Sequence, residues 1–132
     1  MHERPRSENI DQICAKYSIG IIREMKKNEY DPKEVQNLIT KALGVLQQQG
    51  LYAFGLFCKA ESKAGKILEN IIKMLHEIEV LDNSTENELS KLSKLSENIH
   101  DLILAVEIVE KTLIYSRYHA KALVKETSTQ SE

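Results

Sequence analysis

The stretch between residues 42 and 59 constrains the fold more than any other part of the chain. Three glutamines at positions 47–49 precede Gly50, and an almost unbroken apolar run then extends from Leu51 to Cys58. A helix that is apolar on every side has to be covered by other elements. The run is also far too short to cross a bilayer, which takes about 20 residues. We therefore predict a short helix buried at the centre of a helical bundle.

The composition favours one domain built from long helices. The chain has 132 residues, of which 42% are hydrophobic and 29% charged, and its net charge of -2 excludes a strongly basic nucleic-acid-binding protein. Only two prolines and five glycines are present, which favours long helices over many short strands. We predict an all-α, compact single-domain bundle of five to six helices spanning residues 1–132, with flexible tails at 1–6 and 126–132.

The two cysteines and the N-terminus indicate in which cellular compartment the protein acts. Cys14 and Cys58 both lie among apolar residues, and a secreted disulfide scaffold would carry more cysteines. We expect two reduced, buried thiols. The polar N-terminus lacks the apolar segment of a secretory signal, and no segment is long enough to span a membrane. These features predict a cytoplasmic protein.

Helix boundaries follow from caps and apolar spacing. The first helix is expected from a cap at Ser7 to Lys27, and the second from a cap at Asp31, with Pro32 in its first turn, to the glutamines. Gly50 is expected to end it as a left-handed cap. The further expected helices are 51–60, one capped by Ser62, a weaker one at 85–95, and a last one from about Glu97 to Lys125.

Each expected helix carries an apolar stripe that should face inward. The stripe residues are Ile10, Ile13, Cys14, Tyr17, Ile21 and Met25, then Val35, Leu38, Ile39, Ala42, Val45 and Leu46, then Ile67, Leu68, Ile71, Ile72, Leu75 and Ile78, then Leu89, Leu92 and Leu95, and finally Ile99, Leu102, Ile103, Val106, Leu113, Ala120 and Leu123.

Charge is distributed unevenly along the chain. Between Glu77 and Glu110 the acidic residues far outnumber the lysines, whereas the segment from Lys111 to Lys125 carries basic residues and no acid. A nearly neutral protein can therefore present one acidic and one basic face. Basic clusters at helical spacing contact backbone phosphates without reading sequence. The candidate RNA-binding residues are Arg23, Lys27, Lys59, Lys63, Lys66, Arg117 and Lys121.

Patterns that would support catalysis or metal binding are weak. The pair Glu97 and His100 has metal-like spacing, but a di-iron bundle needs two such motifs and further glutamates, and no second copy is present. His119 fits a packing or partly exposed position, and Cys58 has no histidine nearby in sequence. No arginine is followed by histidine at the spacing of small helical ribonucleases. We predict no catalytic residue, metal, cofactor or small-molecule substrate.

Two motifs carry a resemblance to a known family. The first comprises Gln48, Gln49, Gly50, Leu51, Ala53, Leu56, Phe57 and Lys59, with Phe54 inside it, and the second comprises Ala105, Leu113, Tyr115, Arg117, Ala120, Ala122 and Leu123. Together they resemble the small helical subunit (the fifth Cmr protein) of type III-B CRISPR Cmr complexes, which cut RNA under guide control. In that family Asn is usual at position 49, Trp at 115 and Arg at 118.

The resemblance implies a non-catalytic scaffold in an antiviral ribonucleoprotein. Copies of such a subunit stack in the inner filament and contact the backbone subunits, the large subunit and the guide and target RNA, whose target strand they help to seat. Partners would accordingly be other Cmr subunits, copies of the chain itself and RNA, with no membrane. The acidic flank of one copy could face the basic flank of the next, which gives head-to-tail stacking.

Two other classes of function stay open. A helical scaffold unrelated to RNA could bind a partner helix through an apolar groove, and its binding would hardly respond to salt. A metal-dependent nuclease could assemble its site from His76, Glu77, His100 and Asp101. A helix-turn-helix around Gly50 is disfavoured because the following helix is apolar where a recognition helix is polar.

Overall fold

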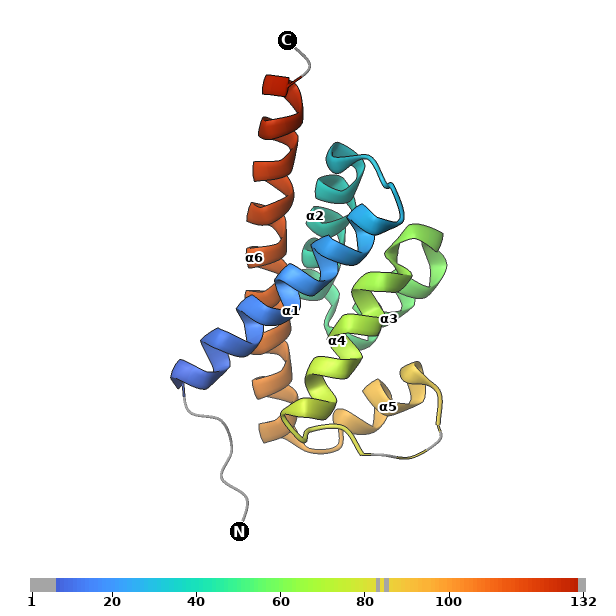
Figure 1. Cartoon of the computed structure of the whole chain (residues 1–132). Coiled ribbons are helices and arrows are strands. Elements are labelled where there is room, and N and C mark those ends of the chain that lie inside the picture. The colour runs from blue at the N-terminus through green and yellow to red at the C-terminus, as the bar shows by residue number, and fades with distance from the viewer. Residues whose placement is uncertain (1–6, 83, 85, 131–132) are drawn as a thin grey trace.

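The described residues form six α-helices and one short 3-10 turn (Figure 1). The computed structural model describes residues 7–82, 84 and 86–130, with side chains between 9 and 127. The elements are α1 (Ser7–Lys27), α2 (Pro32–Gln49), α3 (Leu51–Ala60), the turn η1 (Ser62–Ala64), α4 (Gly65–Glu77), α5 (Glu88–Leu95) and α6 (Ile99–Gln130). No strand occurs in these ranges, so the all-α prediction is confirmed.

The long helix α6 runs along one edge of the bundle (Figure 1). It packs against both α1 and α2, and α1 also packs against α4. The helix α3 contacts α2, α4 and α5, so it links α2 to the helices α4 and α5. Among the described residues, no helix combines the length and the hydropathy that a bilayer crossing would need.

Three small polar side chains are fully buried inside the bundle. Ser18 on α1 and Thr112 and Ser116 on α6 are fully buried. Each hydroxyl donates a hydrogen bond to a carbonyl of its own helix, at 2.7 Å for Ser18 and 2.8 Å for the other two. A buried hydroxyl that is bonded in this way carries no unpaired donor into the core.

The helix α3 is only half covered, which corrects the expectation of burial on every side. Phe54 and Cys58 are buried, but Tyr52 and Leu56 are 47% and 46% exposed. Phe57 packs partly buried against the core. The apolar run therefore supplies two faces, one inside the bundle and one at its surface. Position and length were predicted correctly, since α3 spans Leu51–Ala60.

The predicted entry to α2 is confirmed, and its exit differs in detail. The Asp31 carboxylate accepts the backbone N–H of Glu34 at 3.3 Å, with Pro32 in the first turn. Gly50 has φ 96° and ψ -176°, which is not the left-handed helical conformation that we expected. It still has a positive φ, a region that glycine adopts far more easily than other residues. Within α2, Val45 was expected to face inward but is only half-buried, and Leu43, which was not expected there, is buried.

Several predicted boundaries were wrong by a few residues. Ser62 does not cap α4, because it lies within the turn η1. The helix expected at 85–95 begins at Glu88, where the Asn87 side chain accepts the N–H of Ser90 at 2.9 Å. The Ser7 cap and Thr85 fall outside the described side chains. A loop with several polar residues offers several possible N-cap positions, and the sequence alone does not distinguish between them.

The last helix departs most from the prediction. It begins at Ile99 rather than Glu97, because the Asn98 side chain accepts the N–H of Asp101 at 3.1 Å. It continues to Gln130, so positions 126–130 of the expected tail are helical, while 1–6 and 131–132 lie outside the described residues. Ile99 and Ile103 are 59% and 51% exposed, so they do not belong to the inward stripe.

Candidate nucleic-acid interface

Lysines from three helices gather around two adjoining hollows. Lys27 of α1 meets Lys66 and Lys73 of α4 around a hollow of about 470 Å³. Lys66 also lines a second hollow of about 220 Å³ together with Lys59 of α3. Because Lys66 is shared, the two hollows form a single surface, which we call the lysine surface. It comprises Lys27, Lys59, Lys66 and Lys73 with the acids Glu24, Glu69 and Glu88, and Asn28, Tyr30, Cys58, Ser62, Gly65 and Leu68.

An aromatic ring lies within this surface. Tyr30 belongs to the loop between α1 and α2 and lines the second hollow. The Lys63 ammonium lies 5.5 Å from the centroid of its ring, within the range of a cation–π contact. A half-exposed aromatic ring flanked by ammonium groups is the arrangement on which bases of single-stranded nucleic acids stack.

Three lysines of this region are paired with acids, Lys59 and Lys63 with acids of other helices and Lys66 with an acid of its own helix. Lys59 lies 2.6 Å from Glu88, and Lys63 lies 2.6 Å from Glu34. The hydrogen bond from Lys63 to Glu34 raises the pKa of this lysine, and the hydrogen bond to Glu69 raises that of Lys66. All these groups are at least partly exposed, and exposed ion pairs contribute little to stability. A phosphate can therefore replace a carboxylate here at small cost.

The structure separates the remaining candidates into two groups. Arg23 is exposed on α1 one turn before Lys27, so it extends the lysine surface along that helix. Arg117 and Lys121 lie on α6 and line neither hollow. The Arg117 guanidinium instead lies 5.9 Å from the ring of Tyr118. Five of the seven predicted residues thus lie in one region, and two belong to another face.

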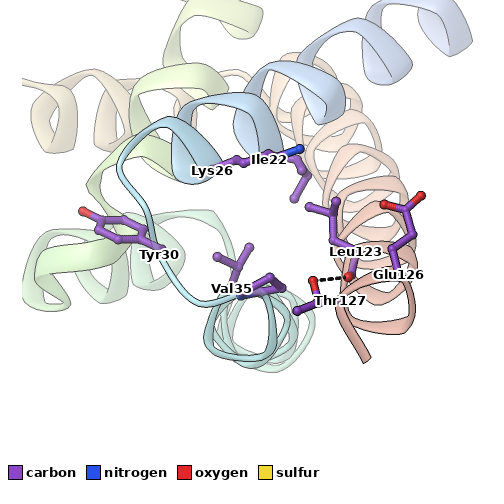
Figure 2. A pocket seen from close by; sticks show the side chains of 8 residues that line it. Ile22, Lys26, Tyr30, Val35, Leu123, Glu126 and Thr127 are labelled. Carbon is purple, nitrogen blue, oxygen red and sulfur yellow. Dashed lines mark hydrogen bonds between the residues drawn. The ribbon is translucent and has the colours of Figure 1, made fainter. Parts of the chain in front are cut away.

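A third hollow lies at the far end of α6 (Figure 2). It measures about 170 Å³ and is lined by Ile22, Lys26, Tyr30, Pro32, Val35, Leu123, Glu126 and Thr127. Figure 2 shows Ile22, Val35 and Leu123 pointing toward one another, whereas the Tyr30 hydroxyl points away from Leu123. The hollow exists because α6 continues past Lys125 and covers the start of α2. Its lining is mainly apolar and brings few polar groups together.

The motif residues behind the family resemblance are mostly structural. Leu51, Phe54 and Ala120 are buried, whereas Gln48 and Gln49 are exposed at the end of α2. Tyr115 donates a hydrogen bond to Asp11, which also forms an ion pair with Lys111 at 2.8 Å. The hydrogen bond from Lys111 holds the pKa of Asp11 below its ordinary value. Tyr115 therefore fastens α6 to α1.

In the described residues, the thiols and histidines lie apart from one another. Cys14 and Cys58 are free and buried, and burial raises the pKa of Cys58 to about 12. His76 is within 3.2 Å of the Lys91 ammonium, while His100 and His119 are exposed on α6. Glu77 pairs with Lys16 at 2.9 Å. In the described part of the chain, no three His, Cys, Asp or Glu side chains lie close enough together to hold a metal ion.

Two residues of the lysine surface were missed at the level of sequence. Tyr30 was assigned only to a loop, although an aromatic residue between polar loop residues was a usable signal. Lys73 lies two turns after Lys66 on the same face of α4, and that spacing could have identified it. The acids Glu24 and Glu69 were not predictable as members, because their position depends on how α1 crosses α4.

Comparison with known proteins identifies no relative. Family models, curated proteins and solved structures were each compared with the chain, and none of them matches it.

Proposed function

We propose that the protein is the non-catalytic small subunit of a type III-B CRISPR (Cmr) ribonucleoprotein, which helps to seat target RNA in antiviral defence. The observation that carries this proposal is the convergence of Lys27, Lys59, Lys66 and Lys73 around two adjoining hollows, one of which is also lined by Tyr30. The two sequence motifs support the assignment to that family. In this proposal the chain acts in the cytoplasm, beside copies of itself and the other Cmr subunits.

The charge balance of the lysine surface fits a subunit that binds RNA with help from its partners. Its four lysines are accompanied by Glu24, Glu69 and Glu88, so the excess of positive charge is small. Affinity for a nucleic acid depends mainly on how many phosphates are neutralised. We therefore expect weak binding by the isolated chain and firm seating of RNA only where other subunits add further basic groups.

The role of individual side chains follows from their chemistry. The ammonium groups of Lys27, Lys66 and Lys73 contact backbone phosphates without reading the sequence. Tyr30 offers a face on which one base can stack, a contact worth about 1–3 kcal/mol in proteins that bind single strands. This combination suits a subunit that accepts any target sequence and leaves recognition to base pairing with the guide.

The first test measures binding of the full chain to a fluorescently labelled single-stranded RNA by anisotropy. In K27E/K66E we expect affinity about tenfold lower than in the wild type. The matched control K33E/K41E changes the same net charge at exposed lysines of α2 and should stay within about twofold. Equal losses in both variants would contradict the lysine surface.

The second test examines whether the protein is part of a Cmr complex. A tagged full chain is purified from its native cell, and the co-purifying RNA and proteins are identified. The proposal requires short guide RNA and the other Cmr subunits, with less target RNA retained by K27E/K66E than by K33E/K41E. A preparation free of guide RNA and of those subunits would overturn it.

A protein-binding scaffold is a second candidate, favoured by the exposed face of α3. Tyr52 and Leu56 lie one turn apart and are each about half exposed. Such side chains suit a partner helix, whose binding is driven by apolar contact. The two functions respond differently to salt, because RNA binding weakens steeply as salt rises, whereas binding through Tyr52 and Leu56 should change little.

A further inference from the structure

The helix α6 runs along the edge of the molecule, so one of its sides faces away from the bundle (Figure 1). The opposite side, with Ala105, Val109, Thr112 and Ser116, is buried against α1 and α2. The outward residues recur at spacings of three and four, as one face of a helix requires. We name this face the α6 strip, and it consists of Ile99, Ile103, Glu107, Glu110, Ile114, Arg117, Tyr118 and Lys121.

The α6 strip exposes large apolar side chains that the bundle leaves uncovered. Ile99, Ile103 and Tyr118 are 59%, 51% and 61% exposed, and they account for half of the large exposed hydrophobic residues of the described chain. Ile114, between them, is half-buried and also packs partly against the core. An apolar strip of this length on a helix without glycine or proline is a surface on which another helix can lie.

The charges of the strip are arranged in two opposite halves. Glu107 and Glu110 precede Ile114, and Arg117 and Lys121 follow it. None of these four side chains forms an ion pair with another described residue, although Lys59, Lys63, Lys66 and Lys94 all do. The strip is therefore complementary to itself when two copies lie antiparallel, and repulsive when they lie parallel.

The spacing of the charges fixes the register of such a pair. Glu107 and Lys121 lie at equal distances before and after Ile114, about two helical turns in each direction. A two-fold axis at Ile114 therefore places Glu107 of one copy opposite Lys121 of the other. The same axis brings Glu110 beside the partner's Arg117 and Tyr118, places the two Ile114 side chains at the axis, and sets Ile103 opposite the aliphatic stem of the partner's Lys125, so the register is fixed mainly by charge.

We propose that the protein forms a two-fold dimer through antiparallel pairing of its α6 strips, centred on Ile114. Each contact away from the axis is made twice, as in any interface of this symmetry, so the assembly closes at two copies. This arrangement differs from the head-to-tail stacking expected from sequence. It uses a face of the molecule separate from the lysine surface, and it does not rest on the proposed RNA function.

The test is the mass of the full chain in solution, measured by sedimentation equilibrium. We expect a dimer at about 50 mM salt and weaker association at about 500 mM, where surface charges are screened. The single variants E107K and K121E should each weaken dimerisation about tenfold or more. The double variant E107K/K121E should restore it, because each new lysine then faces a new glutamate.

Controls separate this interface from a general effect of charge. K41E alters an exposed lysine of α2 and should leave the dimer unchanged, and circular dichroism of every variant should match the wild type. The variant I114C should form a disulfide-linked dimer under mild oxidation, whereas N37C, exposed on α2, should not. A monomer at every concentration, masses above two copies, or a double variant as weak as the single ones would overturn the proposal.

Discussion

Leu92 of α5 packs directly on the backbone of α3 at Gly55. A Cβ atom added at Gly55 would lie 2.7 Å from the Cδ1 atom of Leu92 and 3.0 Å from the Cδ2 atom of Leu89. Real Cβ atoms essentially never approach another atom within 3.0 Å, so a side chain at position 55 would force these leucines to shift. The short helix α5 is therefore held on the bundle by two leucines that use the absence of a side chain on α3.

The variant G55A should destabilise the protein, whereas G44A should stabilise it. Alanine is favoured over glycine in a helix by about 1 kcal/mol, which applies at both positions. At Gly44 nothing lies within 4 Å of the new atom, so that gain is retained. At Gly55 overpacking costs about 1–3 kcal/mol because the buried Leu92 has to move. Urea denaturation of both variants measures the difference.

Amide hydrogen exchange locates the effect of G55A. Faster exchange confined to α5 would show that this helix has loosened from α3. Equal stabilities of G55A and G44A would mean that Leu89 and Leu92 change rotamer without loss, and that α5 is not fastened at this point.

The hinge between α2 and α3 gives a second prediction, at Gly50. Its φ of 96° and ψ of -176° belong to a region that is almost confined to glycine, so G50A should cost about 1–3 kcal/mol of unfolding free energy. G65A is the matched control, because Gly65 has the helical values φ -56° and ψ -38° with open space around it. Thermal unfolding should show a loss for G50A only.

Much of this fold was predictable from sequence, because the cues are local. The pairing of Asp31 with Pro32 fixed the start of α2, and the position of Gly50 between polar and apolar residues fixed its end. The stripe from Ile67 to Ile78 is buried as predicted. Cues of this kind depend only on neighbours along the chain.

Predictions of which side chains are buried were wrong where burial depends on how the helices pack against one another. Ile99 and Ile103 continue the apolar spacing of α6, yet they point outward because no helix of the described chain covers that side. Tyr52 and Leu56 are exposed for the same reason. The lysine surface was predicted only in part, because the acids Glu24 and Glu69 join it through the packing of α1 against α4.

The two faces of α3 give a third prediction. Phe54 is fully buried, so F54A should lower the free energy of unfolding by about 3–5 kcal/mol. Leu56 is 46% exposed, so L56A should lower the free energy of unfolding by about 1 kcal/mol or less. Guanidinium denaturation of the two variants provides the comparison. Similar losses would mean that the outer face of α3 is also covered in solution.

The Cys58 thiol gives a prediction for alkaline pH. Burial raises its pKa from an ordinary value of 9.0 to about 12, with a smaller contribution from Glu88. Between these values the thiol ionises in the unfolded chain but stays protonated in the folded one. The unfolded state then binds fewer protons, so this contribution to stability is complete below pH 9 and is lost as the pH rises toward 12.

Comparison with C58A isolates this contribution. Between about pH 8 and about pH 10.5, the wild type should lose about 2 kcal/mol more than C58A, since each pKa unit is worth about 1.4 kcal/mol. Cys14 and the tyrosines are common to both proteins and cancel in the comparison. Urea denaturation at each pH provides the free energies, and the difference in their slopes is unaffected by any constant loss from the smaller side chain. Parallel curves for the two proteins would show that solvent reaches Cys58 in the native state, and iodoacetamide would then alkylate it at the rate of an exposed thiol.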